Sequence, residues 1–250
     1  MKTLTEIANH YELDKGTLEN PSWAKANPDN IVCGYTPIYE KYMDPVRNHI
    51  ISLLEIGIWD HRFPGNSLRM WDEYFTSPHR NILGVDNFWE GVGPNTRGDN
   101  IREAQKVLQS YTVEVDYVDM SNRRNWTDYF CTEMSFGFGS SHRGLDFVID
   151  DGSHWPSHIM IAFASVFPHV RSGGWYFIED VQIEGRAGKN AYDNVQIGAA
   201  FLATSLLSWN PKDFPRLYIT RKEHSYLINH MSQVRLHRCN ENYLIAIQKT

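Results

Sequence analysis

Residues 145–180 read LDFVIDDGSHWPSHIMIAFASVFPHVRSGGWYFIED. Two apolar runs in this stretch are typical of buried strands, and each ends in a pair of carboxylates; a histidine follows the first pair closely. Because neighbouring parallel strands end at one edge of a sheet, where open α/β sheets bind ligands, we expect these side chains to gather there. Four acids and a histidine at one edge indicate a metal site with a base beside it. They are Asp150, Asp151, His154, Glu179 and Asp180.

The stretch is part of a longer alternation of strand and helix patterns that begins at Ile51. This alternation predicts a doubly wound, mostly parallel α/β sheet. Strands are expected at 52–58, 81–86, 112–118, 145–149 and 175–178, and helices at 67–75, 100–110, 122–134, 155–169 and 190–209, with a Gly/Ser-rich loop at 135–144.

The two ends of the chain have a different character. The C-terminal part is expected to be β-rich, and a turn at 240–242 predicts a terminal antiparallel hairpin, which makes the sheet mixed. The N-terminal part shows helix-like segments and a Pro/Asn/Asp-rich loop but no strong strand pattern. We therefore expect an N-terminal helical cap over residues 1–50 and an α/β domain over residues 51–250. The expected C-terminal β segments are 216–220, 224–228, 234–237 and 243–248.

Composition restricts the classes of protein that remain. The chain has 250 residues, a net charge of −6 and no dense Lys/Arg run, which argues against a generic nucleic-acid binder. Its three cysteines lie far apart and form no CxxC pair, so we expect neither a disulfide framework nor a Cys-based zinc site. This cysteine usage fits a reducing compartment. No apolar run is long enough to span a membrane, and the first residues lack the apolar part of a signal peptide. We expect a cytoplasmic protein.

Three earlier strand ends have the features of a nucleoside pocket. Glu55 and Gly57 end the first strand, and a glycine there allows close approach to the backbone. Asp86 ends the second strand, where an acid can accept two ribose hydroxyl hydrogen bonds. Asp119 ends the third, within reach of an adenine amino group. Asp86 and Asp119 could instead be turn residues, and the full GxGxxG dinucleotide motif is absent.

Together the segments LLEIGI, SLRMWDEYF, NILGVD, DFVIDDGSH and GGWYFIED resemble the class I S-adenosylmethionine-dependent methyltransferases. More narrowly, they resemble the Mg²⁺-dependent O-methyltransferases that act on sugars of macrolides and other glycosylated natural products. The N-terminal DKG and GYTPIYEKY segments are similar to that group as well. IDDGSH with a downstream IED is the specific part of the resemblance, which covers most of residues 10–182.

The resemblance implies an enzyme with S-adenosylmethionine and Mg²⁺ as cofactors and a sugar or glycoside hydroxyl as methyl acceptor. It places Glu55, Gly57, Asp86, Asp119 and Asp150 beside S-adenosylmethionine. It makes Asp151, Glu179 and Asp180 the metal ligands and His154 the base. The loop at 59–66 departs from the family, because it is longer than the short Gly-rich loop expected after the first strand.

Two other functions remain open from the residues alone. One is a non-catalytic protein that binds S-adenosylmethionine, although such a protein would not need the metal and base residues. The other is a metal-dependent hydrolase or oxygenase on the same sheet, although an oxygenase usually has two His ligands and one carboxylate. The acceptor, the oligomeric state and the identity of the hard divalent cation also stay open, and homo-oligomerisation is compatible with the aromatic N-terminal segment.

Overall fold

The computed structural model describes residues 1–19, 21–22, 32–58, 65–88, 97–137, 144–181, 218–240 and 242–250, with side chains at 132–137 excepted. Its helices are α1 (Leu4–His10), α2 (Thr36–Met43), α3 (Asn66–Tyr74), α4 (Arg97–Leu108), α5 (Arg123–Gly137), α6 (Pro156–Val166) and α8 (Arg221–His230). Two short 3-10 helices, η2 (Asp44–Val46) and η3 (Phe167–His169), extend α2 and α6. The strands are β1 (Ser52–Ile56), β2 (Asn81–Asp86), β3 (Val113–Tyr117), β4 (Leu145–Asp150), β5 (Val170–Val181), β6 (Met231–Cys239) and β7 (Asn242–Lys249).

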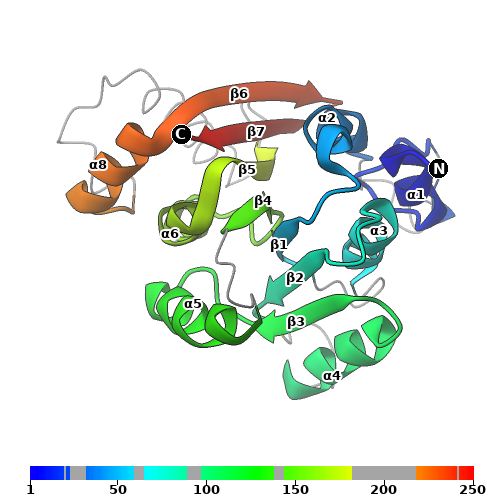
Figure 1. The fold of residues 1–250 in the computed structure, drawn as a ribbon, viewed down its shortest axis with the longest axis horizontal. Coiled ribbons are helices and arrows are strands. Elements are labelled where there is room, and N and C mark those ends of the chain that lie inside the picture. Colours follow the sequence, from blue (N-terminus) through cyan, green and yellow to red (C-terminus); the bar gives the residue numbers. More distant parts are fainter. Residues whose placement is uncertain are drawn as a thin grey trace.

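The seven strands form one sheet in the order β3-β2-β1-β4-β5-β7-β6 (Figure 1). Strands β1 to β5 pair in parallel, whereas β7 pairs antiparallel with both β5 and β6. The strand order reverses between β1 and β4, the position at which open α/β sheets bind ligands. The predicted doubly wound, mostly parallel sheet with an antiparallel C-terminal hairpin is confirmed.

Each face of the sheet has its own hydrophobic core because successive residues of a strand point to opposite faces. On one face, Leu54 and Val148 pack in a core with buried side chains of α5, α6 and α8. On the other face, Leu53 and Ile149 pack in a core with buried side chains of α1, α2, α3 and α4. The N-terminal residues thus share a core with the sheet, and Figure 1 shows α1 and α2 beside α3.

A capping box fixes the start of α1. The Thr3 hydroxyl accepts a hydrogen bond from the Glu6 backbone N–H, and the Glu6 carboxylate accepts one from Thr3 N–H. Leu4 and Ile7 of this helix are fully buried. The chain then turns back toward the sheet, so that Lys15 points inward with only 2% of its surface exposed.

The C-terminal part differs from the sequence prediction in one element. Residues 224–228 were expected to be β, but they belong to α8. The reason is a second capping box, in which Thr220 and Glu223 satisfy each other's backbone N–H groups and so nucleate a helix. Tyr218 to Thr220 are likewise outside any strand, and residues 216–217 lie outside the described ranges.

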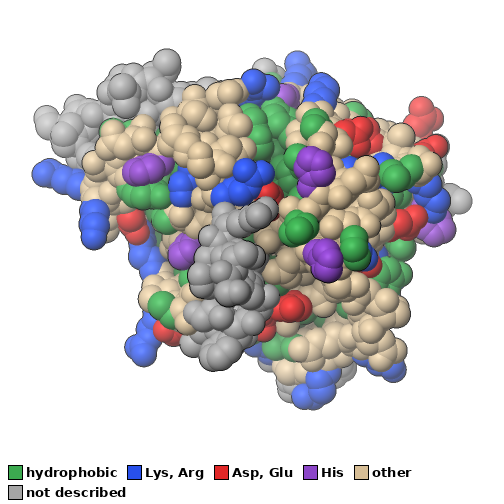
Figure 2. Space-filling view, viewed as in Figure 1, with side chains coloured by type: hydrophobic (Ala, Val, Ile, Leu, Met, Phe, Trp, Pro, Cys, Tyr) green, Lys and Arg blue, Asp and Glu red, His purple; other side chains and the backbone are tan. Residues whose placement is uncertain are grey.

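Other differences concern boundaries. Helix α5 continues to Gly137, into the segment expected to be loop, and β5 starts at Val170 rather than near Trp175. The expected helix at 190–209 and most of the loop at 59–66 fall outside the described residues. No helix within the described ranges is long and apolar enough to cross a membrane. Lys and Arg side chains are scattered over the face in Figure 2 rather than gathered there, which fits the absence of a dense basic run in the sequence.

Candidate active site

The ends of β4 and β5 bring the predicted site residues together. Because side chains alternate between the two faces along β4, Asp150 lies on the face that α5 and α6 cover. There it accepts a hydrogen bond from Tyr176 Oη at 3.0 Å. Asp151 lies just beyond the strand end and points to the opposite face, toward Lys15. The two neighbouring aspartates therefore point to opposite faces of the sheet, and the roles predicted for them stay predictions.

Gly57 makes room for the turn that carries Asp151. Its φ of +88° is in the left-handed region, which favours glycine. A Cβ on Gly57 would lie 2.2 Å from the Asp151 carbonyl oxygen and 2.6 Å from Gly152 Cα. Asp151 N also donates to Ile56 O at 2.9 Å. The chain after β4 thus approaches Gly57 closely, and the contact of Gly57 with S-adenosylmethionine stays a prediction.

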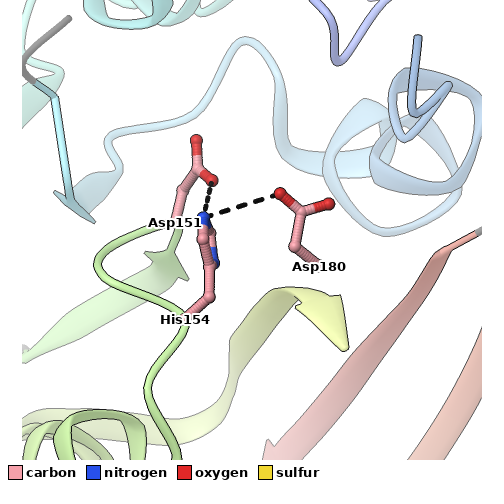
Figure 3. Close-up of side chains that lie close together, drawn as sticks. All are labelled: Asp151, His154 and Asp180. Atoms are coloured by element: carbon pink, nitrogen blue, oxygen red, sulfur yellow. Dashed lines mark ion pairs between the residues drawn. The ribbon is translucent and has the colours of Figure 1, made fainter. Parts of the chain in front are cut away.

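His154 faces two carboxylates (Figure 3). Its Nε2 lies 3.6 Å from Asp180 Oδ2 and 3.9 Å from Asp151 Oδ1. Each of these three side chains offers one possible ligand atom, and the three atoms all lie within 4.8 Å of one another. This spacing is compatible with a shared metal ion. About a third of the His154 side chain (36%) is exposed, so a molecule from solvent can reach it.

Asp180 owes its orientation to an irregularity near the end of β5. The pairing of β5 with β7 shifts register between Ile178 and Val181, and Asp180 has a φ of +55°. Such a shift re-aims a side chain, and a left-handed conformation in a residue with a Cβ is a strained state that must be held by its surroundings. His154 has a similar φ of +57°.

Donors on one oxygen hold Asp180 in place. Oδ1 accepts hydrogen bonds from Tyr35 Oη and Asn242 Nδ2, each at 2.6 Å, while Oδ2 faces His154. Tyr35 Oη also accepts from the Asp180 backbone N–H at 3.0 Å. Burial alone would raise the pKa of Asp180, but the nearby His154 and the hydrogen bond from Tyr35 hold this pKa below its ordinary value.

Glu179 points into the interior and is nearly inaccessible, with 2% of its side chain exposed. Its Oε1 accepts from Tyr39 Oη at 2.5 Å and its Oε2 from Lys15 Nζ at 2.6 Å. Burial, and next the nearby Asp151 carboxylate, raise the pKa of Glu179 well above its ordinary value. Both oxygens of this predicted metal ligand are therefore occupied, and Lys15 also donates to Asp151 Oδ2.

Glu55 lies in the same buried cluster rather than apart from it. Its Oε2 accepts from Trp71 Nε1 at 3.1 Å, and its Oε1 lies 3.7 Å from Lys15 Nζ. Within the described part of the chain, Glu55 Oε1 has no hydrogen-bond partner although it is buried. Burial raises the pKa of Glu55 to about 7, against the lowering effect of the Lys15 charge. Asp150 is also buried, and burial raises its pKa to about 7.

Asp86 is the last residue of β2, and Asp119 lies just after β3. Both aspartates form hydrogen bonds within local turns. Asp86 accepts from the backbone N–H groups of Ile58 (2.9 Å) and Phe88 (2.7 Å). Asp119 accepts from the backbone N–H of Ser121 at 2.9 Å and from its hydroxyl at 2.6 Å. These bonds are the turn chemistry that the sequence left open, and the predicted contacts of both acids with a nucleoside stay predictions.

Oxygen donors dominate the cluster at the ends of β4 and β5. Hard oxygen ligands suit Mg²⁺ or Ca²⁺, and the outward oxygens of Asp151 and Asp180 converge beside His154. The Lys15 ammonium already occupies the space between Asp151 and Glu179, which shows that these carboxylates accommodate a cation. The residues therefore fit a hard divalent cation, with a histidine next to it that can accept a proton.

Sequence reasoning did not anticipate how the N-terminal cap supports the site. Lys15 donates to Asp151 and Glu179, and the two buried tyrosines, Tyr35 and Tyr39, anchor Asp180 and Glu179. Their spacing of four residues at the start of α2 places them on one helix face, and this was the available signal.

Comparison with known proteins connects this geometry to an enzyme group. No protein-family model matches the chain. Over 180 residues the chain is 32% identical to L-olivosyl-oleandolide 3-O-methyltransferase of Streptomyces antibioticus. This match covers 71% of this chain and 36% of that protein. Over 150 residues it is 33% identical to mycinamicin VI 2''-O-methyltransferase of Micromonospora griseorubida, covering 59% of this chain and 31% of that protein. The matched part thus spans about a third of the length of these relatives.

A solved structure shows the same fold. MycE methyltransferase from the mycinamycin biosynthetic pathway, in complex with Mg, SAH and mycinamycin VI, matches with a TM-score of 0.62 at 22% identity. The match covers 100% of this chain and 55% of that chain. The chain is therefore similar, over about a third of their length, to O-methyltransferases of natural-product biosynthesis, and it has the Rossmann-like methyltransferase fold.

Proposed function

We propose that the protein is an S-adenosylmethionine- and Mg²⁺-dependent O-methyltransferase that acts on a hydroxyl of a sugar or glycosylated metabolite. The observation that carries this proposal is the position of His154 Nε2 between Asp151 and Asp180, at the carboxyl ends of β4 and β5. A base beside two oxygen ligands is what methylation of a weakly acidic hydroxyl requires. The relatives act on sugars, as their names state.

The residues divide the reaction between them. His154 Nε2 takes the proton of the acceptor hydroxyl, whose oxygen forms a bond to the methyl carbon. The methyl donor would keep the electron pair of its carbon–sulfur bond and would leave as a neutral thioether. Asp151 and Asp180 orient His154 and stabilise the positive charge that the imidazole gains.

Asp151, Asp180 and Glu179 are the residues that would hold Mg²⁺. Such a cation supplies positive charge that lowers the pKa of a neighbouring hydroxyl and helps fix its direction. S-adenosylmethionine supplies an electrophilic methyl group. We assign its binding to Glu55, Gly57, Asp86, Asp119 and Asp150, which lie at or just beyond the ends of β1, β2, β3 and β4.

We further propose that residues 1–50 act as a cap that completes the site of the domain formed by residues 51–250. Three buried donors from the cap, Lys15, Tyr35 and Tyr39, contact the carboxylates at the ends of β4 and β5. The cytoplasmic location and homo-oligomerisation stay predictions from the sequence.

The direct test is incubation of the purified chain with S-adenosylmethionine, Mg²⁺ and a panel of deoxysugar glycosides and nucleotide-linked sugars. We expect mass spectrometry to show one product heavier by a methylene group, together with S-adenosylhomocysteine. Calorimetry with S-adenosylmethionine separates the alternatives. Binding without turnover on any glycoside would favour a non-catalytic partner, and absence of binding would favour a hydrolase or oxygenase.

A further inference from the structure

Lys15 occupies an unusual position for a lysine. Its ammonium is buried, with 2% of the side chain exposed, and it lies among the carboxylates of Glu55, Asp151 and Glu179. A buried lysine is stable only when its charge is paired. It donates to Asp151 Oδ2 and Glu179 Oε2, and both residues are proposed above as metal ligands.

One oxygen of the third carboxylate, Glu55, lacks a donor. Glu55 Oε1 is buried and, among the described residues, accepts no hydrogen bond, while Lys15 Nζ lies 3.7 Å away. A small rotation of the flexible lysine stem closes that distance to a normal hydrogen bond. Leaving a buried carboxylate oxygen without a donor is costly, so an arrangement in which Lys15 binds Glu55 is accessible in free energy.

We propose that Lys15 is an internal counter-cation with two positions. Without metal, its ammonium joins Asp151 to Glu179; when a divalent cation binds these two carboxylates, the ammonium moves to Glu55 Oε1. Lys15 is thus a positioning residue that competes with the metal and keeps the carboxylates aligned until the metal arrives. This inference rests on the metal site of the proposed function.

The charges of the cluster support competition between the Lys15 ammonium and a divalent cation. Glu55, Asp151, Glu179 and Asp180 bring four carboxylates to one small region, and Lys15 is the cation that contacts three of them. Two cations held by the same oxygens repel each other strongly at low dielectric. If a divalent cation takes the Asp151 and Glu179 oxygens that the ammonium uses, the ammonium must move to another oxygen. Glu55 Oε1 is the buried oxygen that has no donor among the described residues.

The test is titration of the full chain with Mn²⁺, followed by electron paramagnetic resonance of the unbound ion. Lys15→Met keeps the length of the side chain but removes the competitor, so we expect Mn²⁺ to bind roughly tenfold more tightly or better. Lys2→Met is the matched control, because Lys2 also pairs with a carboxylate, Glu73, but at the surface. It should leave Mn²⁺ binding unchanged.

Glu55→Gln gives an independent readout through a double-mutant cycle. With Lys15 present, loss of the Glu55 charge removes the second position of the ammonium, so Mn²⁺ should bind several-fold more weakly. In the Lys15→Met background the same change should have a much smaller effect. Equal weakening in both backgrounds would mean that Glu55 acts only as a distant negative charge, and would overturn the proposal.

Unchanged or weaker Mn²⁺ binding by Lys15→Met would also overturn it, while tight binding by the wild-type chain would leave the proposed function standing. A wild-type chain that binds no Mn²⁺ would instead contradict the metal site itself. If Lys15→Met fails to fold without metal, Lys15→Gln retains one donor, and its tighter Mn²⁺ binding tests the same claim.

Discussion

His154 Nε2 lies 3.6 Å from Asp180 Oδ2, and both residues have a left-handed backbone, with φ near +57° and +55°. Neither residue is a glycine, so both conformations cost free energy that the surroundings must offset. Tyr35 and Asn242 hold Asp180, and each carboxylate of the pair Asp151 and Asp180 uses one oxygen for anchoring and presents the other to His154. These hydrogen bonds therefore fix the direction in which both carboxylates face His154.

Replacing His154 by Ala removes the assigned base. Because general base catalysis contributes roughly 10²–10⁴-fold, we expect kcat to fall by that factor while calorimetric affinity for S-adenosylmethionine stays unchanged. His158→Ala is the matched control, since His158 lies four residues away and pairs with Ser153 Oγ. A near-normal rate for His154→Ala, or an equal loss in both variants, would remove His154 from the mechanism.

Tyr35→Phe removes a donor to Asp180 without changing the size of the side chain. The Asp180 Oδ1 oxygen loses one of its hydrogen bonds, so the carboxylate is less firmly oriented toward His154. A hydrogen bond to a charged group contributes about 1.5–3 kcal/mol, and we expect unfolding in urea to show a loss within that range together with a lower kcat. Tyr11→Phe is a control, because Tyr11 donates to Glu73 at a distance of 3.2 Å outside this cluster. A kcat equal to that of the control would contradict a positioning role.

Replacing Gly57 by Ala should damage both stability and the site. The new Cβ would overlap the Asp151 carbonyl at 2.2 Å in addition to the strain of a φ of +88°. Strain of about 1–2 kcal/mol and overpacking of about 1–3 kcal/mol predict a loss of roughly 2–5 kcal/mol in the free energy of unfolding.

Gly173→Ala separates the two contributions. Gly173 has a similar φ of +78°, but the nearest atom to its added Cβ is Arg171 Nη1 at 3.7 Å. It should therefore lose only the strain of about 1–2 kcal/mol, as measured by urea unfolding. Equal losses for the two variants would show that contact with Asp151 is unimportant.

Stability should fall in mildly acidic solution because of His169. Burial, and next the charge of Lys249, lower the pKa of His169 to about 4, and its ring stacks on Phe130 with a centroid distance of 3.6 Å. The folded pKa lies below the ordinary value of about 6.5, so the unfolded chain takes up the proton first as pH falls. The contribution of neutral His169 to the stability of the folded chain is therefore fully present above about pH 6.5, and it is lost progressively between about pH 6.5 and 4.

Thermal unfolding of wild type and His169→Phe between pH 7.5 and 4.5 measures this effect. The stability difference between the two chains should shift in favour of the variant by on the order of 1–2 kcal/mol, which allows for solvent screening of a partly exposed ring. A difference that does not change with pH would contradict the assignment.

Much of the fold follows from sequence patterns. The apolar runs of β1, β2 and β4 are buried on both faces and therefore read clearly as central strands. The strand predicted at residues 224–228 was wrong because apolar residues in a short segment do not distinguish a strand from a helix. There the decisive signal was the Thr220–Glu223 capping box, which fixes a helix start.

The gathering of Asp151, His154 and Asp180 could be predicted from the sequence, but the hydrogen bonds of the cluster could not. Two acidic strand ends placed Asp151 and Asp180 near His154, as strand geometry requires. The burial of Glu179 and the position of Lys15 arise from packing of the N-terminal cap on the sheet, a long-range contact that no local pattern encodes. The turn bonds of Asp86 and Asp119 likewise depend on backbone groups beyond the strand ends.

The measurement that tests the central claim most directly is the initial rate of methyl transfer from labelled S-adenosylmethionine to a glycoside acceptor as free Mg²⁺ is varied. The chain is first stripped with EDTA, and Asp180→Asn is measured in parallel. We predict that the rate falls to background after chelation, returns in a saturable manner with Mg²⁺, and requires more Mg²⁺ in Asp180→Asn. A rate that survives thorough chelation would contradict the metal role given to Asp151, Glu179 and Asp180.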